Sequence, residues 1–381
     1  MDQLHAAPCG GLLPPLQPTQ QLQIRKQVKV KNASFVAKCI CSNIIAFWAH
    51  VSRLWQCPPP RFLPRLPPPR AKTALLLSQA ELIAQTSSNW IYVTQMGPGR
   101  VLKVSRSLDR SYREYKLHMQ VESAFKSVQR DLSQNGFDLD LPYIPECHGF
   151  CPNVATSPCS ETFNCLDGFP KNGSGYFMEY IHPLNQHHAK YLIRRYLTSS
   201  AQSRALSSPA SKHFLAKVYL GDTKPLSDQW NADMHDRPAY LDHLLAERVE
   251  VCYLAASMGA TLAILHWLVG IDAKGVEFVL GRDNRGHVQF WLIDFSDSQP
   301  FDRTPESATR QLVDAVVHNQ PFWPRWINIR GLRELWACFR NAYLEVSDLI
   351  IKDDDDEATK VLPHLFMNEL EKIRGSGFLL A

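Results

Sequence analysis

A long apolar helix is predicted between residues 247 and 268, where the chain reads ERVEVCYLAASMGATLAILHWL. Its apolar side chains recur at helical spacing, at Val251, Leu254, Met258, Leu262 and Leu265. A helix with so little polar surface is stable in water only when other elements enclose it. The chain is therefore expected to build its core around this segment.

A β-hairpin is predicted directly after this helix, because VEFVLG and HVQFWLIDF flank the polar turn RDNRG. A second hairpin is predicted earlier, from NWIYVTQ (89–95) and RVLKVSR (100–106) around the turn MGPG. Further strands are expected at 141–151 and 175–184, and helices at 107–132, 187–197, 237–246 and 332–351. Residues 71–85 are expected to form a short helix or a lead-in to the first hairpin. Strands thus cluster in the first half and helices dominate the second, with one isolated hairpin. This order predicts an α+β fold.

Residues 1–72 form a basic, proline-rich extension. They hold 11 of the 26 prolines, ten of the 41 Lys and Arg residues, and Asp2 as their one acidic residue. Such a segment cannot bury a core, so we expect it to be largely disordered and extended. Residues 34–55 carry apolar side chains at helical spacing, but the run is too short to cross a membrane, which takes about 20 residues. We expect an amphipathic helix that packs on the main domain; a membrane-surface helix, a partner-binding helix and a mitochondrial leader are the alternatives.

The remainder of the chain is mildly acidic, with 31 basic and 36 acidic residues in 73–381. A surface with this charge is not expected to bind nucleic acid. The sequence identifies no protein partner. Ten cysteines and no secretory leader at the start indicate reduced thiols in an intracellular protein, in the cytoplasm or the nucleus.

Four of the cysteines cluster in CHGFCPNVATSPCSETFNC, at Cys147, Cys151, Cys159 and Cys165. Four thiolates could hold zinc tetrahedrally. Their spacings, however, do not form the paired knuckles typical of a zinc site. We therefore expect an insertion over residues 147–172 with unlinked thiols, and do not expect zinc. A zinc-binding regulator that uses this cluster is the weaker alternative.

The segment that follows the apolar helix, GIDAKGVEFVLG (270–281), concentrates charge at the start of a strand. It holds Asp272, Lys274 two positions later and Glu277 three positions after that. Such a segment is either a solvated loop or part of a catalytic site. As a site, Asp272 could orient an acceptor hydroxyl and Glu277 could bind Mg²⁺, which prefers oxygen ligands. A salt bridge from Glu277 to Lys274 or to an Arg is the structural alternative.

Three further charged residues complete the candidate site, two at the ends of apolar strands and one in the first half of a helix. Lys103 ends a strand, Glu114 lies eleven residues later in the next helix, and Asp294 closes the strand FWLIDF. An Asp that closes an apolar strand costs stability unless it is paired or ligated. Phosphoryl transfer uses these residue types, because a Lys held by a Glu can neutralise nucleotide phosphates and an Asp can carry magnesium. Glu122 is the competing partner for Lys103.

These residues and their surroundings resemble the protein-kinase-like fold, including its aminoglycoside-phosphotransferase branch. The Asp272-to-Glu277 separation equals the Asp-to-Asn spacing of the kinase catalytic loop. More closely, the chain resembles an uncharacterised fungal family of unknown function whose members are often labelled "zinc finger protein". The shared stretches are HFLAKVYLG (213–221), ATLAILHWLVGIDAKGVEFVLG (260–281), FWLIDFSDS (290–298), VVHNQPFWPR (316–325) and LWACFRNAYLEVS (335–347).

The kinase resemblance implies a bilobal fold, with a sheet-rich N-lobe at 73–184 and a helical C-lobe at 185–381. It also implies a site for ATP and Mg²⁺. Lys103 and Glu114 would bind the nucleotide, Asp294 and Glu277 the metal, and Asp272 and Lys274 would act in catalysis. The chain departs from the kinase pattern in two places, since no Gly-rich loop precedes the first hairpin and Glu277 replaces the usual Asn. These departures favour the alternative, a catalytically inactive pseudokinase-like module that binds a protein partner.

Overall fold

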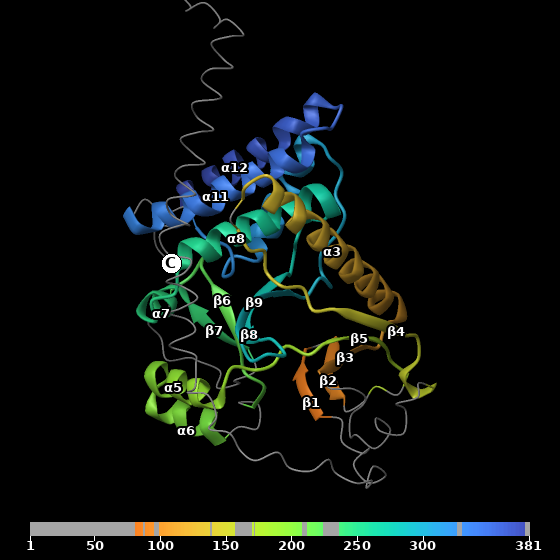
Figure 1. Ribbon diagram of the computed structural model, residues 1–381, viewed down its shortest axis with the longest axis vertical. Helices are drawn as coiled ribbons and strands as arrows, with labels where there is room; N and C mark the ends of the chain where they lie inside the picture. The colour runs from red at the N-terminus through yellow and green to blue at the C-terminus, as the bar shows by residue number, and fades with distance from the viewer. Residues whose placement is uncertain are drawn as a thin grey trace, which may run out of the picture.

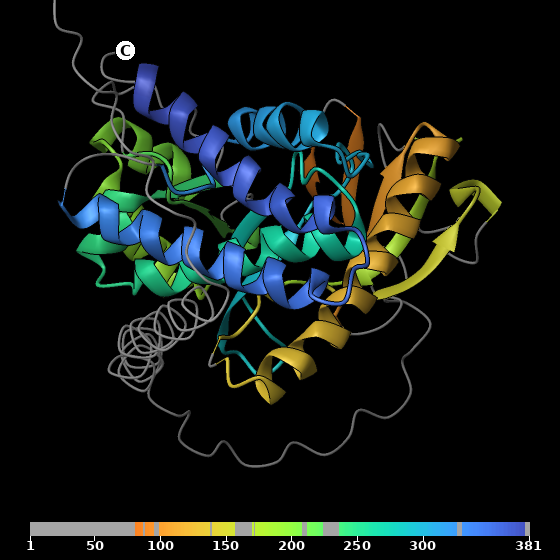
Figure 2. The same ribbon diagram turned by 90° about the horizontal axis from the view of Figure 1, so that it is seen from above.

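The computed structural model describes residues 81–86, 88–94, 99–137, 139–156, 170, 172–207, 212–223, 236–325 and 330–377 (Figures 1 and 2). The extension 1–72 with its predicted helix at 34–55, and the clustered cysteines Cys159 and Cys165, lie outside the described residues. The described part of the chain combines two β-sheets with packed helices. The α+β class predicted from the sequence is therefore confirmed.

A five-stranded antiparallel sheet makes up the first half of the described chain. In space the strands follow the order β1-β2-β3-β5-β4, with bounds β1 Glu81–Gln85, β2 Asn89–Thr94, β3 Arg100–Ser105, β4 Cys147–Cys151 and β5 Ser174–Glu179. Alternation along the strands sends Trp90, Tyr92, Leu102 and Val104 to one face, where they form a small core with Cys151 and Val154. The opposite face is left for a helix.

That helix is α3 (Leu108–Gln134), which contacts β3, β4 and β5 and runs from beside β4 toward the helical part of the protein (Figure 1). The side chain of Ser107 caps its first turn by accepting the Arg110 N–H at 3.3 Å. The buried side chains recur every three or four residues, at Ser111, Glu114, Leu117, His118, Val121, Phe125, Val128 and Leu132. The apolar members from Leu117 onward join the main core, so α3 connects the sheet to the helices.

A second sheet has four strands in the order β7-β6-β8-β9, with bounds β6 Leu215–Tyr219, β7 Asp236–Tyr240, β8 Glu277–Arg282 and β9 Val288–Ile293. One face of this sheet carries Phe278 and Leu292 into the helical core, while Val279 and Trp291 on the other face pack with Ile181. The linker between the two sheets crosses this second face, where His182 and Arg282 exchange backbone hydrogen bonds of 3.0 and 2.7 Å.

The helices lie in the second half of the chain, with bounds α5 Gln186–Tyr196, α6 Ser199–Ser207, α7 Leu241–Ala246, α8 Val251–Ala263, α9 Pro305–Thr309, α10 Gln311–His318, α11 Arg330–Ile351 and α12 Glu357–Gly377. α8 continues as a π-helical turn, η3 (Ile264–Val269), and α11 and α12 lie beside it (Figure 2). α8 and α11 approach closely at Gly259, where a Cβ would lie 2.1 Å from the Phe339 carbonyl oxygen. A side chain larger than hydrogen therefore does not fit there.

The run Val251–Val269 is the one helical segment of the described residues that could cross a membrane by length and composition. Its environment is that of a core helix, because 83% of its most apolar 18-residue window is buried inside the protein. The described chain therefore has no clear membrane span, in agreement with the sequence prediction.

The predicted hairpins and the helices expected at 107–132, 187–197, 247–268 and 332–351 are confirmed. Three predictions are wrong. Residues 81–85, expected in a short helix or a lead-in, form strand β1 because they pair with β2. Residues 236–240, most of which were expected in a helix at 237–246, form β7 because they pair with β6. The second hairpin is not isolated, since β6 pairs with β8 through Ala216 and Leu280.

Candidate functional site

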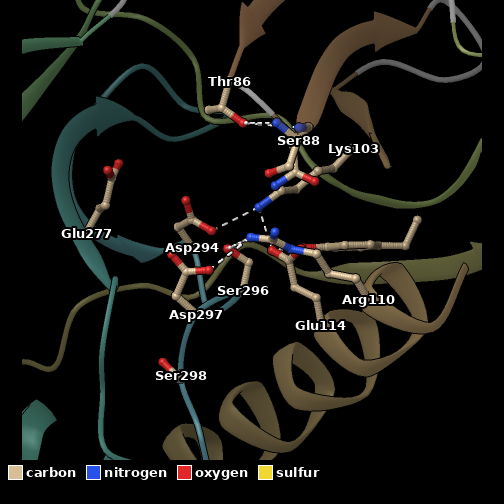
Figure 3. Close-up of polar contacts among 12 residues, drawn as sticks. Thr86, Ser88, Lys103, Arg110, Glu114, Glu277, Asp294, Ser296, Asp297 and Ser298 are labelled. Carbon is tan, nitrogen blue, oxygen red and sulfur yellow. Dashed lines mark hydrogen bonds and ion pairs between the residues drawn. The ribbon is translucent and has the colours of Figure 1, made fainter. Parts of the chain in front are cut away.

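Lys103 lies at the centre of a charged cluster between the two sheets (Figure 3). It points to the α3 side of β3, opposite the face that buries Leu102 and Val104. Its Nζ lies 2.5 Å from Oε1 of Glu114 and 3.0 Å from Oδ1 of Asp294. Although it is charged, Lys103 is only 6% exposed. A buried ammonium group is stable only when paired, and here two carboxylates pair with it.

Glu114 belongs to the buried stripe of α3 and is 3% exposed. Its Oε1 also accepts a hydrogen bond of 3.2 Å from the hydroxyl of Tyr176 on β5. Glu122, the competing partner for Lys103, instead pairs with Lys126 at 2.5 Å and accepts the N–H of Cys147. Lys103 therefore pairs with Glu114, the helix partner predicted from the sequence, and not with Glu122.

Asp294 follows β9 directly and is the most exposed member of the cluster, with a side chain that is 30% exposed. Its backbone has a positive φ of 62°, a conformation that costs energy for a residue other than glycine and is enriched at functional sites. The next residue, Phe295, is 1% exposed and packs edge-to-face on His118 of α3, with ring centroids 5.4 Å apart. This anchor fixes the turn that presents Asp294 to Lys103.

The three charged groups differ in their protonation equilibria. Burial lowers the pKa of Lys103, but Asp294 and Glu114 outweigh it and hold the pKa well above its usual value. Burial raises the pKa of Glu114, and Lys103 opposes this only in part. Burial also acts to raise the pKa of Asp294, but Lys103 outweighs it and the pKa is lowered. The ammonium and the Asp294 carboxylate are therefore the strongly ionised members of the cluster.

Asp272 lies in the segment that joins η3 to β8 and is 3% exposed. Its Oδ1 accepts the backbone N–H groups of Lys274 and Gln299, at 3.1 and 2.9 Å, and its Oδ2 accepts the Gln311 side chain at 3.2 Å. Three of the roughly four acceptor positions of the carboxylate are thus in use. The hydrogen bond from Gln299 connects the loop that holds Asp272 to the segment after Asp294.

Lys274 is partly exposed, and its carbonyl oxygen accepts a hydrogen bond of 2.9 Å from the hydroxyl of Ser298. Next to it, Gly275 has a φ of 79°, and a Cβ at this position would lie 3.0 Å from the Cβ of Asp297. The 272–275 segment and the segment after Asp294 are therefore in direct contact. The structure brings Asp272 and Lys274 next to the charged cluster without a direct ion pair to it among the described residues.

Glu277 begins β8 and lies opposite Ile293, the residue before Asp294. Its Oε1 pairs with Nζ of Lys217 on β6 at 2.7 Å. The salt bridge considered from the sequence is present, but its partner is neither Lys274 nor an Arg. Figure 3 shows Glu277 to one side of the cluster, on the neighbouring strand.

Two groups beside the cluster were not predicted. Arg110 lies one helical turn before Glu114, and its guanidinium reaches Asp297 at 2.9 Å and Ser296 at 3.5 Å (Figure 3). The four-residue spacing on α3 is the signal that could have identified Arg110. The β1–β2 turn also appears in this view, where Thr86 accepts the N–H groups of Ser88 and Asn89 at 3.4 and 3.1 Å.

The cysteine cluster is described only in part. Cys147 and Cys151 are the first and last residues of β4, so residues 147–151 of the predicted insertion 147–172 belong to the sheet. A register shift between Cys147 and Gly149 turns the two thiols to opposite faces, Cys147 toward Glu122 of α3 and Cys151 into the small core of the sheet. Two thiols on opposite faces do not converge on one metal ion.

Residues 290–355 match the model of a family of unknown function that is described as "Zinc finger protein". Three of the stretches on which the sequence resemblance rests, 290–298, 316–325 and 335–347, lie within this match. No curated protein and no solved structure matches the chain. Within the described ranges, no group of three or more His, Cys, Asp or Glu side chains is arranged to hold a metal ion.

Proposed function

We propose that the protein binds a nucleoside triphosphate together with Mg²⁺, as a member of the protein-kinase-like fold. The observation that carries this proposal is the contact of Lys103 with both Glu114 and Asp294. These partners lie 11 and 191 positions away in the sequence, and they come from the helix after β3 and from the end of β9. In protein kinases a strand Lys pairs with a helix Glu, and the metal is held by an Asp at a strand end.

The arrangement of the elements supports the same proposal. The five-stranded antiparallel sheet has one long helix between its third and fourth strands in sequence. The apolar α8, the loop with Asp272 and the β8–β9 hairpin then follow in that order. The kinase resemblance implies this order of a sheet-rich and a helical half.

The charges of the cluster fit a cation and a phosphate chain. One ammonium and two carboxylates leave one net negative charge, which a divalent cation would convert to a net positive charge that suits phosphate oxygens. Asp294 is the exposed carboxylate and would hold Mg²⁺, which commonly needs one or two protein carboxylates while phosphates and water complete its shell. Lys103, held by Glu114, would face the phosphates. Magnesium would supply charge neutralisation there.

Transfer of the phosphoryl group to an acceptor is the further step of this proposal, and Asp272 decides it. An acceptor hydroxyl needs a carboxylate oxygen within about 2.6–3.2 Å. The carboxylate of Asp272 is 3% exposed and already accepts three hydrogen bonds. This observation favours the second candidate function, a module that binds nucleotide without turnover and serves a protein partner.

Thermal unfolding of the full-length chain tests nucleotide binding. Millimolar ATP with Mg²⁺ should raise the melting temperature of the wild type, since a ligand at 100 times its Kd stabilises by about 2.7 kcal/mol. Asp294→Asn should reduce the shift, while Asp354→Asn, which alters a separate ion pair with Arg303, should keep it. No shift in the wild type, or an equal shift in Asp294→Asn, would refute the proposal.

A single-turnover measurement of phosphate release from bound ATP separates the two candidate functions. Release that is lost in Asp272→Asn while the thermal shift is retained would establish phosphoryl transfer. Because release measures transfer to water, its absence from a wild type that shows the shift would favour the binding module and exclude only hydrolysis of ATP.

A further inference from the structure

We propose that Lys217 takes the place of a second divalent cation at this site, so that the protein holds one metal ion per nucleotide, on Asp294. This inference rests on the proposed nucleotide function and deepens it. It reassigns Glu277, which the sequence resemblance placed among the metal ligands, to an internal ion pair.

Glu277 lies at the end of the β8–β9 hairpin that precedes Asp294. Glu277 and Ile293 are cross-strand partners in the β8–β9 hairpin, and Asp294 follows Ile293 directly. The Glu277 and Asp294 backbones therefore lie at the same end of one hairpin. In protein kinases an Asn at the catalytic-loop position of Glu277 binds the second metal ion.

Lys217, the partner of Glu277, lies 60 positions earlier in the chain. Lys217 of β6 is the register partner of Val279, two residues after Glu277 on β8. Because side chains two residues apart share a face of a strand, Lys217 and Glu277 project from the same face of the sheet. On this face Val279 packs with Trp291 and Ile181, away from the helical core.

Lys217 and Glu277 form a short and largely enclosed ion pair. Nζ of Lys217 lies 2.7 Å from Oε1 of Glu277, and the side chains are 13% and 22% exposed. An ion pair this short and this enclosed is far less screened than a surface pair. A second divalent cation on Glu277 would have to displace the ammonium group or lie beside its positive charge.

The Lys217–Glu277 pair balances the charge at this end of the hairpin without a second metal ion. A Glu in place of the neutral Asn adds a negative charge near the phosphates, and Lys217 cancels it. The Lys217–Glu277 pair then adds no net charge beside the phosphates, and the site holds one exchangeable divalent cation, on Asp294. Lys217 is a positioning residue in this account, because it acts on the nucleotide through Glu277.

Counting bound Mn²⁺ by electron paramagnetic resonance, in the presence of saturating ATP, tests the inference on the full-length chain. The wild type should bind one Mn²⁺ per ATP. Lys217→Gln, which leaves the Glu277 carboxylate without this ammonium group, should bind two. Lys217→Arg and the double variant Lys217→Gln with Glu277→Gln should each bind one.

Two Mn²⁺ ions per ATP on the wild type would overturn the inference and leave the nucleotide function standing. One Mn²⁺ per ATP on a folded Lys217→Gln variant would overturn it as well. A wild type that binds no ATP in the presence of Mn²⁺ would overturn both proposals. If Lys217→Gln does not fold, Lys217→Met removes the same ammonium group; two Mn²⁺ per ATP on that variant are expected, and one would overturn the inference.

Discussion

Replacing Lys103 with Met should destabilise the protein by about 3–5 kcal/mol at neutral pH, as expected when one member of a buried ion pair is removed. Lys103 and Glu114 are 6% and 3% exposed, so water cannot replace the lost ammonium group. Glu114 would keep the Tyr176 hydroxyl at 3.2 Å as a hydrogen-bond donor, which is too little for a buried carboxylate. It must remain charged in an apolar site or take up a proton, and both cost stability.

The stability lost in Lys103→Met should depend on pH, and the titration of Glu114 and Asp294 decides whether it grows or shrinks as pH rises. The folded-state pKa of Glu114 is raised above 4.5 by burial, and without Lys103 it rises further. A raised pKa favours the folded state below the ordinary value and ceases to do so as pH rises through the folded-state value. The pKa of Asp294 is lowered from 3.8 against burial by Lys103, and that contribution, present above 3.8, is also lost in the variant. The difference between wild type and variant should therefore be large at neutral pH and small below these values.

Urea unfolding followed by tryptophan fluorescence, at a series of pH values, measures this difference. Lys126→Met is the matched control on the same helix, because the Lys126 side chain is 70% exposed and its ion pair with Glu122 should be worth less than about 1 kcal/mol. Combining Lys103→Met with Glu114→Gln should recover part of the stability, since no buried carboxylate then remains on α3. A Lys103→Met loss no larger than that of Lys126→Met, or one that does not change with pH, would refute the reasoning.

Two further predictions concern the core around α8. Gly259→Ala should lower the thermal midpoint of unfolding, at a cost of about 1–3 kcal/mol for overpacking. The cause is the Phe339 carbonyl oxygen, which would lie 2.1 Å from the added Cβ and outweighs the stabilisation of about 1 kcal/mol that Ala normally gives a helix relative to Gly. A raised midpoint would contradict the close approach of the helices. Burial lowers the pKa of His266 to about 3 from 6.5, so its contribution to stability is complete above 6.5 and declines as pH falls toward 3, by up to about 1.4 kcal/mol per pH unit. His266→Phe should flatten the unfolding free energy over this range in urea titrations, and an unchanged slope would count against a buried neutral imidazole.

The elements predicted correctly from the sequence are those that local pattern decides. The β2–β3 hairpin is rich in β-branched and aromatic residues on both sides of a Gly-Pro turn, and α3 repeats its buried positions every three or four residues. Strands β1 and β7 carry no comparable pattern and are strands because β2 and β6 pair with them. Pairing across the sheet is a tertiary effect, which a single segment of sequence does not encode.

The same distinction holds at the candidate site. Lys103 and Asp294 could be predicted to need partners because each places a charge at the end of an apolar strand. That Glu114 is the helix partner of Lys103 was predicted from the kinase resemblance, in which a strand Lys pairs with a Glu of a helix. Lys217 could not be predicted to pair with Glu277, because its strand was not assigned and 60 positions separate the two residues.

The hydrogen bonds of Asp272 depend on long-range contacts in the same way. Two of its partners, Gln299 and Gln311, lie 27 and 39 positions away in the sequence. The sequence shows an Asp in a loop at position 272. Only the structure shows that its carboxylate is buried and already accepts three hydrogen bonds.

Isothermal titration calorimetry of the full-length protein with ATP, in the presence and absence of Mg²⁺, tests the central claim most directly. One ATP per chain should bind with Mg²⁺, and both removal of Mg²⁺ and Asp294→Asn should weaken binding by about tenfold or more, which is 1.4 kcal/mol. Lys126→Met should leave the affinity unchanged. Absence of binding heat at millimolar ATP, or an affinity that responds neither to Mg²⁺ nor to Asp294→Asn, would contradict the account.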